Sequence, residues 1–391
     1  MDDRKRFFEI FGHVADHEYF APGRVNLIGE YTDYNGGNVF PCALTIGTYG
    51  TVRKREDQIL RLYSENFPEI GMVECSLEVL SYDPKHNWAN YPKGVLWMMK
   101  KEGYVLEEGL DIYIRGTIPN GAGLSSSASI EVLMAFIAKD LFALDLGLVE
   151  LAKLCQRVEN QYIGVNSGIM DQFAVAMGEK DQAILLDTNT LAYRYSTIHL
   201  EDASIVVANT NKKRGLQDSN YNERRAECEE ALRRIQVKLP VNALCEMSYE
   251  QFAAVAPIIG EDALMRRARH AVTENERTLK AVKALENNRI EEFGQLMNES
   301  HRSLKKDFEV TGVELDTLVE LAWAQKGTLG SRMTGAGYGG CSVSIVKNDD
   351  IASFIKEVGA GYEKAIGYAA DFYVVSIGKG VHRISLDKTI R

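Results

Sequence analysis

The feature that most constrains this chain is the segment PNGAGLSSSAS, residues 119–129, which lies between a predicted strand and a predicted helix. The strand is DIYIRGTI, residues 111–118, whose isoleucines suit a pleated surface, and an apolar helix is predicted over 125–142. Gly121 and Gly123 have no Cβ and let the backbone approach a bound group closely. The free N–H groups and positive dipole at a helix start favour an anion. This combination predicts a phosphate-binding loop.

The serines that follow the glycines strengthen this interpretation. Ser125, Ser126 and Ser127 add hydroxyl donors, and one of them could bind a metal ion attached to phosphate. The segment is not the GxxxxGKS or GxxxxGKT phosphate loop, because no lysine follows, and it is not a dinucleotide fingerprint. The structural alternative is a serine-capped helix after a tight turn.

Two further segments combine glycines with features that call for a ligand. GSRMTGAGYGGCSVSI, residues 330–345, has four glycines in six positions before a strand, which is costly in backbone entropy unless the chain passes near a ligand or makes a complicated turn. APGRVNLIGEYTDYNGG, residues 21–37, places Arg24, Glu30 and Asp33 around an apolar stretch. Burying these charges requires partners, which a ligand with several hydroxyls or a neighbouring domain would supply. A surface turn with an ion pair is the alternative.

Composition excludes several classes of function. The 45 Lys and Arg against 55 Asp and Glu leave a net charge of −10, which argues against nucleic acid or an anionic membrane as partner. The six cysteines form no CxxC pair, which is typical of reduced thiols in a cytosolic protein, and no histidine motif indicates a transition metal. We find no signal peptide and no run of the ~20 apolar residues that span a bilayer. A cytoplasmic protein is therefore expected.

The length of 391 residues predicts two domains, at roughly 100–200 residues each. Strand and helix patterns interleave to about residue 190, so residues 1–200 are predicted to form an α/β domain that carries the segments 21–37 and 119–129. After the predicted buried strand at 204–210 the pattern changes to long amphipathic helices. Residues 201–391 are therefore predicted to form a helix-rich α+β domain. The strand DFYVVSI, residues 371–377, closes this domain or returns to the first. The fold class is α+β.

The three glycine-containing segments together resemble the signature motifs of the GHMP small-molecule kinases, and APGRVNLIGEYTDYNGG resembles the galactokinase signature in particular. The similarity continues through NWANYPKGV, GVNSGIMDQF and YNERRAECEEA to YAADFYVV, and so covers nearly the whole chain. It implies a two-domain GHMP-kinase-like fold with the active site between the domains. It also implies ATP-dependent phosphorylation of D-galactose at the 1-hydroxyl, the first committed step of galactose breakdown. The implied partners are a small-molecule sugar and ATP, with Mg²⁺ as cofactor, and the implied assembly is a monomer or weak homo-oligomer.

The resemblance also implies roles for individual residues. Asp171 would be the base that deprotonates the sugar 1-hydroxyl, and Arg24 would stabilise the transition state. By its own pattern Asp171 is a lone carboxylate at the start of an apolar helix, where capping is the alternative role. The implied sugar pocket consists of Glu30, Tyr31, Thr32, Asp33 and Tyr221. The implied ATP site consists of Ser64, Trp88, Gly121, Ala122, Gly123, Leu124, Ser125, Ser126 and Ser127. Mg²⁺ would be held by Ser127 and Glu159, whose oxygens suit a hard cation.

Tyr31 departs from the family pattern, which has GEHTDYN where this chain has GEYTDYN. Tyrosine is longer than histidine and cannot become cationic near neutral pH, so sugar recognition is expected to differ and Tyr31→His to improve galactose kinetics. Ser167 stands where cysteine is common. Two alternatives stay open: a kinase for a related sugar, such as N-acetylgalactosamine or a C6-modified galactose, and a non-catalytic galactose- and ATP-binding regulator. The complete GLSSSAS loop argues against the regulator.

Overall fold

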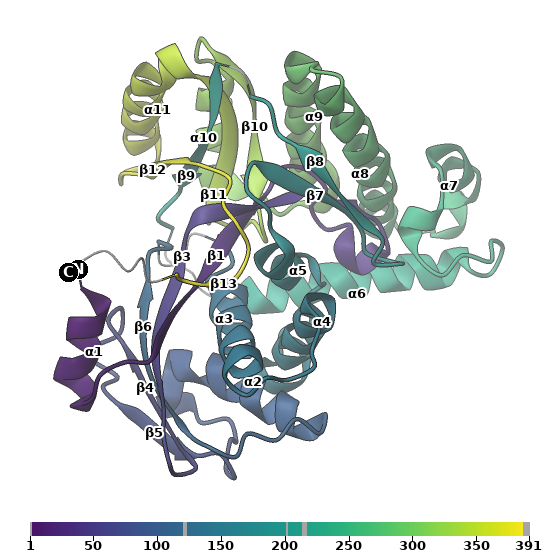
Figure 1. Ribbon diagram of the computed structural model, residues 1–391. Coiled ribbons are helices and arrows are strands. Elements are labelled where there is room, and N and C mark those ends of the chain that lie inside the picture. The colour runs from purple at the N-terminus through teal and green to yellow at the C-terminus, as the bar shows by residue number, and fades with distance from the viewer. Residues whose placement is uncertain (1, 120–122, 201, 213–216, 386–391) are drawn as a thin grey trace.

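The structure, a computed structural model, describes residues 2–119, 123–200, 202–212 and 217–385 in two halves, each a sheet with helices packed on it (Figure 1). The first half contains a six-stranded sheet in the order β13-β1-β3-β6-β4-β5. Its neighbouring strands are antiparallel except for the parallel pair β4 and β6. The strands are β1 (His17–Asn26), β3 (Pro41–Lys54), β4 (Ile59–Ser64), β5 (Val73–Ser76), β6 (Leu110–Gly116) and β13 (His382–Arg383).

Helices cover both faces of this sheet. One face carries α2 (Asn90–Lys101), α3 (Ser126–Leu141), α4 (Leu148–Val158) and α5 (Met170–Met177), and the other carries α1 (Asp3–Phe11) (Figure 1). The apolar repeat that predicts the α4 helix is buried in the main core of this half, where Leu154 of α4 joins Leu133 of α3 and Ile112 of β6. Beyond α4 the chain continues as a π-helical turn over Glu159–Ile163. None of the described helices is both long and apolar enough to cross a membrane.

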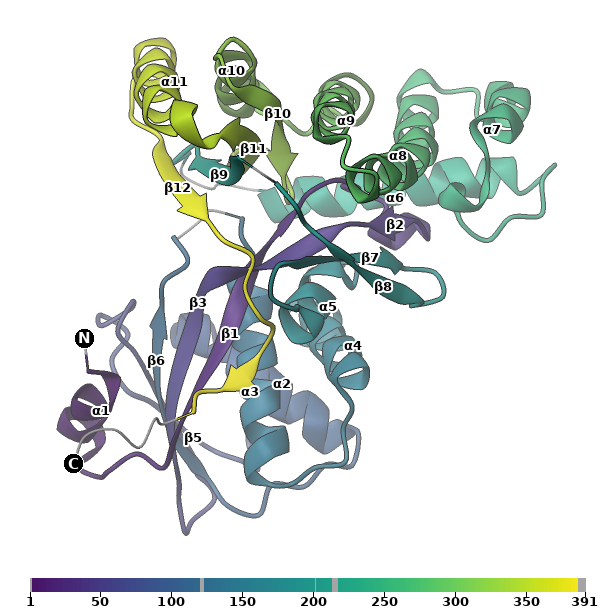
Figure 2. The ribbon, with the colours of Figure 1, turned by 45° about the horizontal axis from the view of Figure 1, so that its top comes forward.

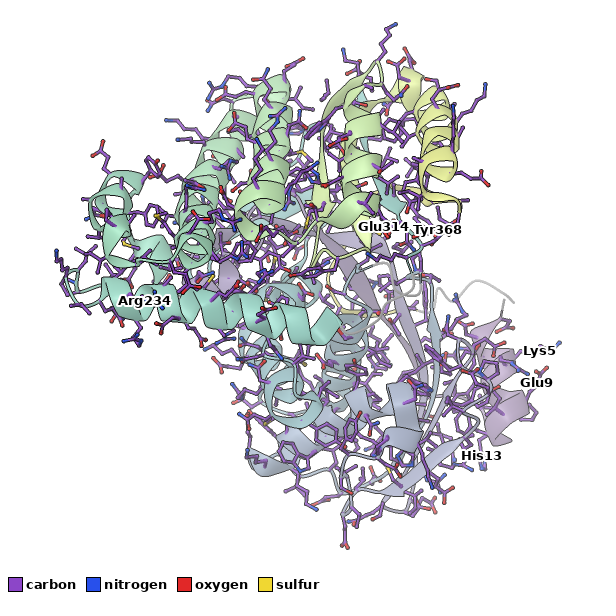
Figure 3. The ribbon with its side chains drawn as sticks, turned by 180° about the vertical axis from the view of Figure 1, so that it is seen from behind. Lys5, Glu9, His13, Arg234, Glu314 and Tyr368 are labelled. Carbon is purple, nitrogen blue, oxygen red and sulfur yellow. The ribbon has the colours of Figure 1, made fainter. Side chains whose placement is uncertain are left out.

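The second half is built on an antiparallel four-stranded sheet in the order β10-β11-β9-β12. Figure 2 shows a layer of helices lying over it. Seen from behind in Figure 3, α6 runs across the junction between the halves, with Arg234 towards its outer end. The strands are β9 (Ala203–Asn209), β10 (Thr328–Thr334), β11 (Cys341–Lys347) and β12 (Asp371–Val375). The helices are α6 (Gln217–Ile235), α7 (Tyr249–Val255), α8 (Asp262–Glu286), α9 (Ile290–Ser303), α10 (Gly312–Trp323) and α11 (Ile351–Ile366).

The two halves are joined by a shared core and by the chain itself. Val25 and Phe40 of the first half belong to the same buried apolar cluster as Phe293 and Val343 of the second. A small sheet in the order β2-β7-β8 lies at this junction, where it contacts α8; its strands are β2 (Asn38–Val39), β7 (Gln182–Asp187) and β8 (Tyr193–Thr197). The boundary predicted near residue 200 falls between β8 and β9. Strand β12 pairs with β9 in the second sheet, and the chain then returns to the first sheet, where β13 pairs with β1 (Figure 2).

Candidate active site

Arg24 is brought into the site by an irregularity in β1. The pairing of β1 with β3 shifts register between Pro22 and Arg24, and such a bulge re-aims the side chains around it. Gly23 permits the close packing at this point, because a Cβ there would lie 2.8 Å from the carbonyl oxygen of Leu124. The Arg24 side chain is therefore buried, and it points its guanidinium at Asp171.

Arg24 and Asp171 form a two-point ion pair. The Nε–H of Arg24 donates to Oδ1 at 2.8 Å and the Nη2–H to Oδ2 at 2.7 Å, which is the strong fork geometry of arginine with a carboxylate. The Nη1–H donates to the carbonyl of Gly123 at 2.9 Å. Burial lowers the pKa of Arg24, but the charge of Asp171 and its hydrogen bonds, together with the charges of Glu30 and Asp33, outweigh burial and raise the pKa overall. The pair thus presents a carboxylate of fixed orientation.

Asp171 also accepts a hydrogen bond from the serine-rich loop. It lies in the first turn of α5, and the Ser125 hydroxyl donates to its Oδ2. Ser125 precedes α3 with φ at 61°, a left-handed conformation that is uncommon outside glycine and that clusters at functional sites. The N-terminus of α3 and the predicted base are therefore held side by side.

Glu159 begins the π-helical turn after α4 and is buried. Its Oε2 accepts a hydrogen bond of 2.6 Å from the Ser167 hydroxyl. Burial raises the pKa of Glu159, and hydrogen bonds from Ser167 and Ser127 partly oppose that rise. The Ser127 hydroxyl and the Glu159 carboxylate, which the sequence predicts as partners, are thus neighbours in the structure.

Ser127 and Glu159 suit a magnesium ion by their chemistry. Mg²⁺ prefers oxygen ligands, and in kinases one or two carboxylates and the substrate phosphates commonly hold it. In the part of the chain that the structure describes, no group of three or more His, Cys, Asp or Glu is arranged to hold a metal ion. A magnesium ion at these two side chains would therefore take its other ligands from phosphate and water.

Glu30 faces the second half of the molecule. Its side chain is buried, and its Oε1 accepts hydrogen bonds from the Thr334 hydroxyl at 3.1 Å and the Gly335 N–H at 2.8 Å. Both donors belong to the glycine-rich segment 330–345. The charged residue that the sequence places in the sugar pocket is therefore oriented by groups about 300 residues away along the chain.

Tyr31 has its hydroxyl engaged by the protein. The hydroxyl donates to the carbonyl of Ala336 at 2.5 Å, and the ring packs against Phe308 and Tyr221 with centroid distances of 4.5 and 5.6 Å. Histidine is too short to repeat this bond, so the geometry gives no support to an improvement by Tyr31→His. Thr32 is buried and donates its hydroxyl to backbone carbonyls of the same loop, and it does not line the cavity.

Asp33 packs closely against the loop that precedes α5. A Cβ at Gly168 would lie 1.9 Å from Asp33 Oδ2, so any other residue there would force the Asp33 carboxylate to move. Burial, and after it the charges of Asp171 and Glu30, raises the pKa of Asp33 to about 7. The Tyr34 N–H, which donates to Oδ1 at 3.0 Å, opposes this rise. Asp33 is therefore a carboxyl group that titrates near neutral pH.

These side chains surround a cavity of about 250 Å³ at the junction of the two halves. The first half contributes both charged and polar walls, and residues 335–338 close it from the second half. The lining residues are Arg24, Glu30, Tyr31, Asp33, Tyr91, Gly123, Ser125, Ser126, Ser127, Glu159, Val165, Ser167, Gly168, Met170, Asp171, Tyr221, Gly335, Ala336, Gly337 and Tyr338. The size and polarity suit a small hydroxylated molecule.

A second cavity of about 190 Å³ adjoins the first and shares Tyr91, Ser126 and Ser127 with it. Ser64 and Trp88 line this second cavity, together with mostly apolar groups of the first sheet and α3. The serine-rich start of α3 therefore separates a polar cavity from a more apolar one. Two adjoining cavities of this kind can hold a sugar and a nucleotide with phosphates between them.

Some predicted residues fall outside this arrangement, and others were missed. Gly121 and Ala122 lie outside the described residues, and Leu124 is buried without lining either cavity. Sequence reasoning missed Tyr91, which lies in the NWANYPKGV segment and faces both cavities. It also missed Gly168, although this glycine lies only three residues before Asp171 and its lack of a side chain was the available signal.

Comparison with known proteins identifies the family. Residues 5–54 match the description "Galactokinase galactose-binding signature", residues 90–179 match "GHMP kinases N terminal domain" and residues 281–364 match "GHMP kinases C terminal". The chain is 58% identical over 379 residues to a galactokinase of Enterococcus faecalis, covering 97% of this chain and 98% of that protein. The chain belongs to the galactokinase family.

Solved structures agree with this assignment to the galactokinase family. The crystal structure of Lactococcus lactis galactokinase complexed with galactose is 50% identical and superposes with a TM-score of 0.96, covering 97% of this chain and 98% of that one. The Methanococcus jannaschii mevalonate kinase is 17% identical with a TM-score of 0.66 over 93% of this chain and 98% of that one, and so shares the fold. The two-domain GHMP kinase fold predicted from the motifs, with mixed sheets and packed helices, is confirmed.

Proposed function

We propose that this protein transfers the γ-phosphoryl group of ATP to the 1-hydroxyl of D-galactose, giving α-D-galactose 1-phosphate and ADP. The observation that carries the reaction type is the Arg24–Asp171 pair beside the serine-rich start of α3, where the two cavities meet. The sugar is assigned from the relatives, which are named galactokinases at 50–58% identity, one of them solved with galactose.

In this mechanism Asp171 accepts the proton of the sugar 1-hydroxyl as the bond between that oxygen and the γ-phosphorus forms and the bond to the ADP oxygen breaks. Arg24 holds the carboxylate in place and offsets negative charge near the transferring group. The N–H groups at the start of α3 favour phosphate. Ser127 and Glu159 would hold Mg²⁺, which, when bound, neutralises phosphate charge.

An ADP-release assay over a panel of sugars tests this proposal. We expect turnover with ATP and galactose that is abolished by EDTA and restored by Mg²⁺, and much weaker turnover with N-acetylgalactosamine, 6-deoxygalactose and glucose. If the protein instead prefers N-acetylgalactosamine or 6-deoxygalactose, that sugar and not galactose is the substrate. Binding of galactose and ATP without any ADP release would establish the regulator instead.

No contact in the cavity favours either alternative. Tyr31, the residue that suggested another sugar, lines the cavity while its hydroxyl donates to the carbonyl of Ala336. The location in the cytoplasm and the monomeric or weakly associated state stay predictions from the sequence.

A further inference from the structure

The segment that follows β1 is held by the second half of the molecule at several points. The Gly29 N–H donates to Glu274 Oε1 of α8 at 3.2 Å, and the Glu30 carbonyl contacts His270 Nε2 at 3.1 Å. Glu30 Oε1 accepts hydrogen bonds from the Thr334 hydroxyl and the Gly335 N–H. The predicted sugar-binding loop therefore takes its position from α8 and β10 and not from its own half alone.

Arg332 of β10 lies at the centre of these contacts. Its side chain is 0% exposed, and its Nη1–H donates to the Asn26 carbonyl at 2.7 Å and its Nε–H to the Ser300 hydroxyl at 3.2 Å. Ser300 in turn donates to Glu274 Oε1 at 2.5 Å. The Nη2 atom lies 3.4 Å from Glu30 Oε1. A single buried guanidinium thus hydrogen-bonds the end of β1 and helix α9, and it forms an ion pair without a hydrogen bond with the Glu30 carboxylate.

Glu30 needs this partner for electrostatic reasons. A buried carboxylate is costly unless it is paired and hydrogen-bonded. Arg332 and the donors supply that compensation, and the ion pair and both of these hydrogen bonds fall on Oε1. Because Glu30 lines the cavity, Oε2 is the oxygen left to accept a hydroxyl of a bound molecule.

We propose that Arg332 is a positioning residue for sugar recognition, which acts through Glu30 without touching the sugar. It holds the Glu30 carboxylate in one orientation, with Oε1 turned to the second half of the molecule, so that the other oxygen receives a sugar hydroxyl. Lysine could not substitute, because one ammonium cannot bridge the three partners that the planar guanidinium reaches. This proposal rests on the proposed function, since the ligand at Glu30 is taken to be a hexose.

Arg332→Met tests the proposal, with galactose affinity measured by calorimetry and steady-state kinetics with galactose and ATP. We expect the Kd and KM for galactose to rise at least tenfold, the KM for ATP to stay within threefold and kcat to fall less than the galactose affinity. Thr334→Val removes no charge but takes away the hydroxyl that bonds Glu30 Oε1 and the Asn26 backbone, and it should raise the galactose Kd about three- to tenfold. If Arg332→Met does not fold, the galactose Kd of Thr334→Val tests the proposal in its place.

Arg267→Met provides the matched control. Arg267 is also buried, but its ion-pair partners are Glu227 and Glu309, and among the described residues no ion pair joins it to Glu30. It should lower thermal stability and leave the galactose Kd unchanged. A galactose Kd within twofold of the original in both Thr334→Val and folded Arg332→Met would overturn the proposal, as would an equal rise in the KM values for galactose and ATP. Failure of the unmodified protein to bind galactose at all would instead refute the proposed function.

Discussion

Single residues decide the chemistry, and Asp171 is the clearest case. Replacing Asp171 with Asn keeps the size of the side chain but removes the charge that pairs with Arg24. If Asp171 is the base, kcat should fall by ~10²–10⁴-fold, as is typical of general bases, while galactose affinity changes little. Rapid-quench or coupled assays of the two forms measure this loss.

Asp111→Asn controls for the structural effect of the Asp171 substitution. Asp111 is a fully buried aspartate in β6, between β3 and β4, and it pairs with Arg53, Arg55 and Arg61. Its replacement should reduce stability without a comparable loss of kcat. Turnover of Asp171→Asn within a few-fold of the original would show that Asp171 only orients the substrate.

The raised pKa of Asp33, about 7, makes stability depend on pH. The pKa of Asp33 is near 4 in the unfolded chain and about 7 in the folded protein, so the folded state binds this proton more tightly. As pH rises from 4 to 7, Asp33 therefore progressively lowers the free energy of unfolding. Above pH 7 the destabilisation is complete. Asp33→Asn should therefore stabilise the sugar-free protein by roughly 1–3 kcal/mol at pH 8, with the difference shrinking towards pH 4. Urea denaturation of both forms at pH 4.5, 6 and 8 measures this, and a difference independent of pH would contradict it.

At the scale of elements, the tight contact between the loop before α5 and the loop after β1 shapes the sugar pocket. Gly168→Ala would drive a methyl group into the Asp33 carboxylate. We expect the galactose KM to rise at least tenfold, because Asp33 must move. Gly147→Ala is the matched control, since nothing lies within 4 Å of a Cβ there and its φ of −66° suits alanine. An equal galactose KM in Gly168→Ala and Gly147→Ala would mean that moving Asp33 does not affect galactose binding.

The π-helical turn after α4 is the second element with a direct role. Such turns recur at functional sites, and this one begins at Glu159. Glu159→Ala should raise the Mg²⁺ concentration for half-maximal activity by at least tenfold while the protein stays folded, because one of the two predicted ligands is lost. Titration of activity with Mg²⁺ and a circular dichroism melt together test this. Full activity at low Mg²⁺ would remove Glu159 from the metal site.

At the scale of the whole molecule, residues of both halves line the polar cavity that contains Arg24 and Asp171. The two halves also contribute side chains to one buried apolar cluster. A ligand that contacts both halves binds only the folded state and stabilises it by about 2.7 kcal/mol at a concentration 100 times its Kd. Galactose with a non-hydrolysable ATP analogue should therefore raise the melting temperature by a few degrees in a single transition. A melt in which only one of two transitions moved would show that the halves unfold separately.

The sequence by itself determined the local structure and the kind of chemistry. Periodicity identified strands such as DIYIRGTI and the buried stripe of α4, because these patterns depend on residues a few positions apart. The glycine- and serine-rich segments indicated a phosphate loop for the same reason, and with the galactokinase motifs they pointed to Arg24, Glu159 and Asp171. Those three side chains do line one cavity.

Only the tertiary structure decided which side chains meet. Arg24 and Asp171 are 147 residues apart, and Glu30 and Gly335 are 305 apart, so their contacts follow from strand register and from the packing of the two halves. Tyr31 and Thr32 look alike in sequence as members of a sugar loop. In the fold, Tyr31 reaches Ala336 across the domain junction, whereas the Thr32 hydroxyl bonds the nearby carbonyls of Gly29 and Asn38. Local composition cannot predict these different hydrogen-bond partners, because a polar side chain bonds the group that long-range packing brings within hydrogen-bond distance.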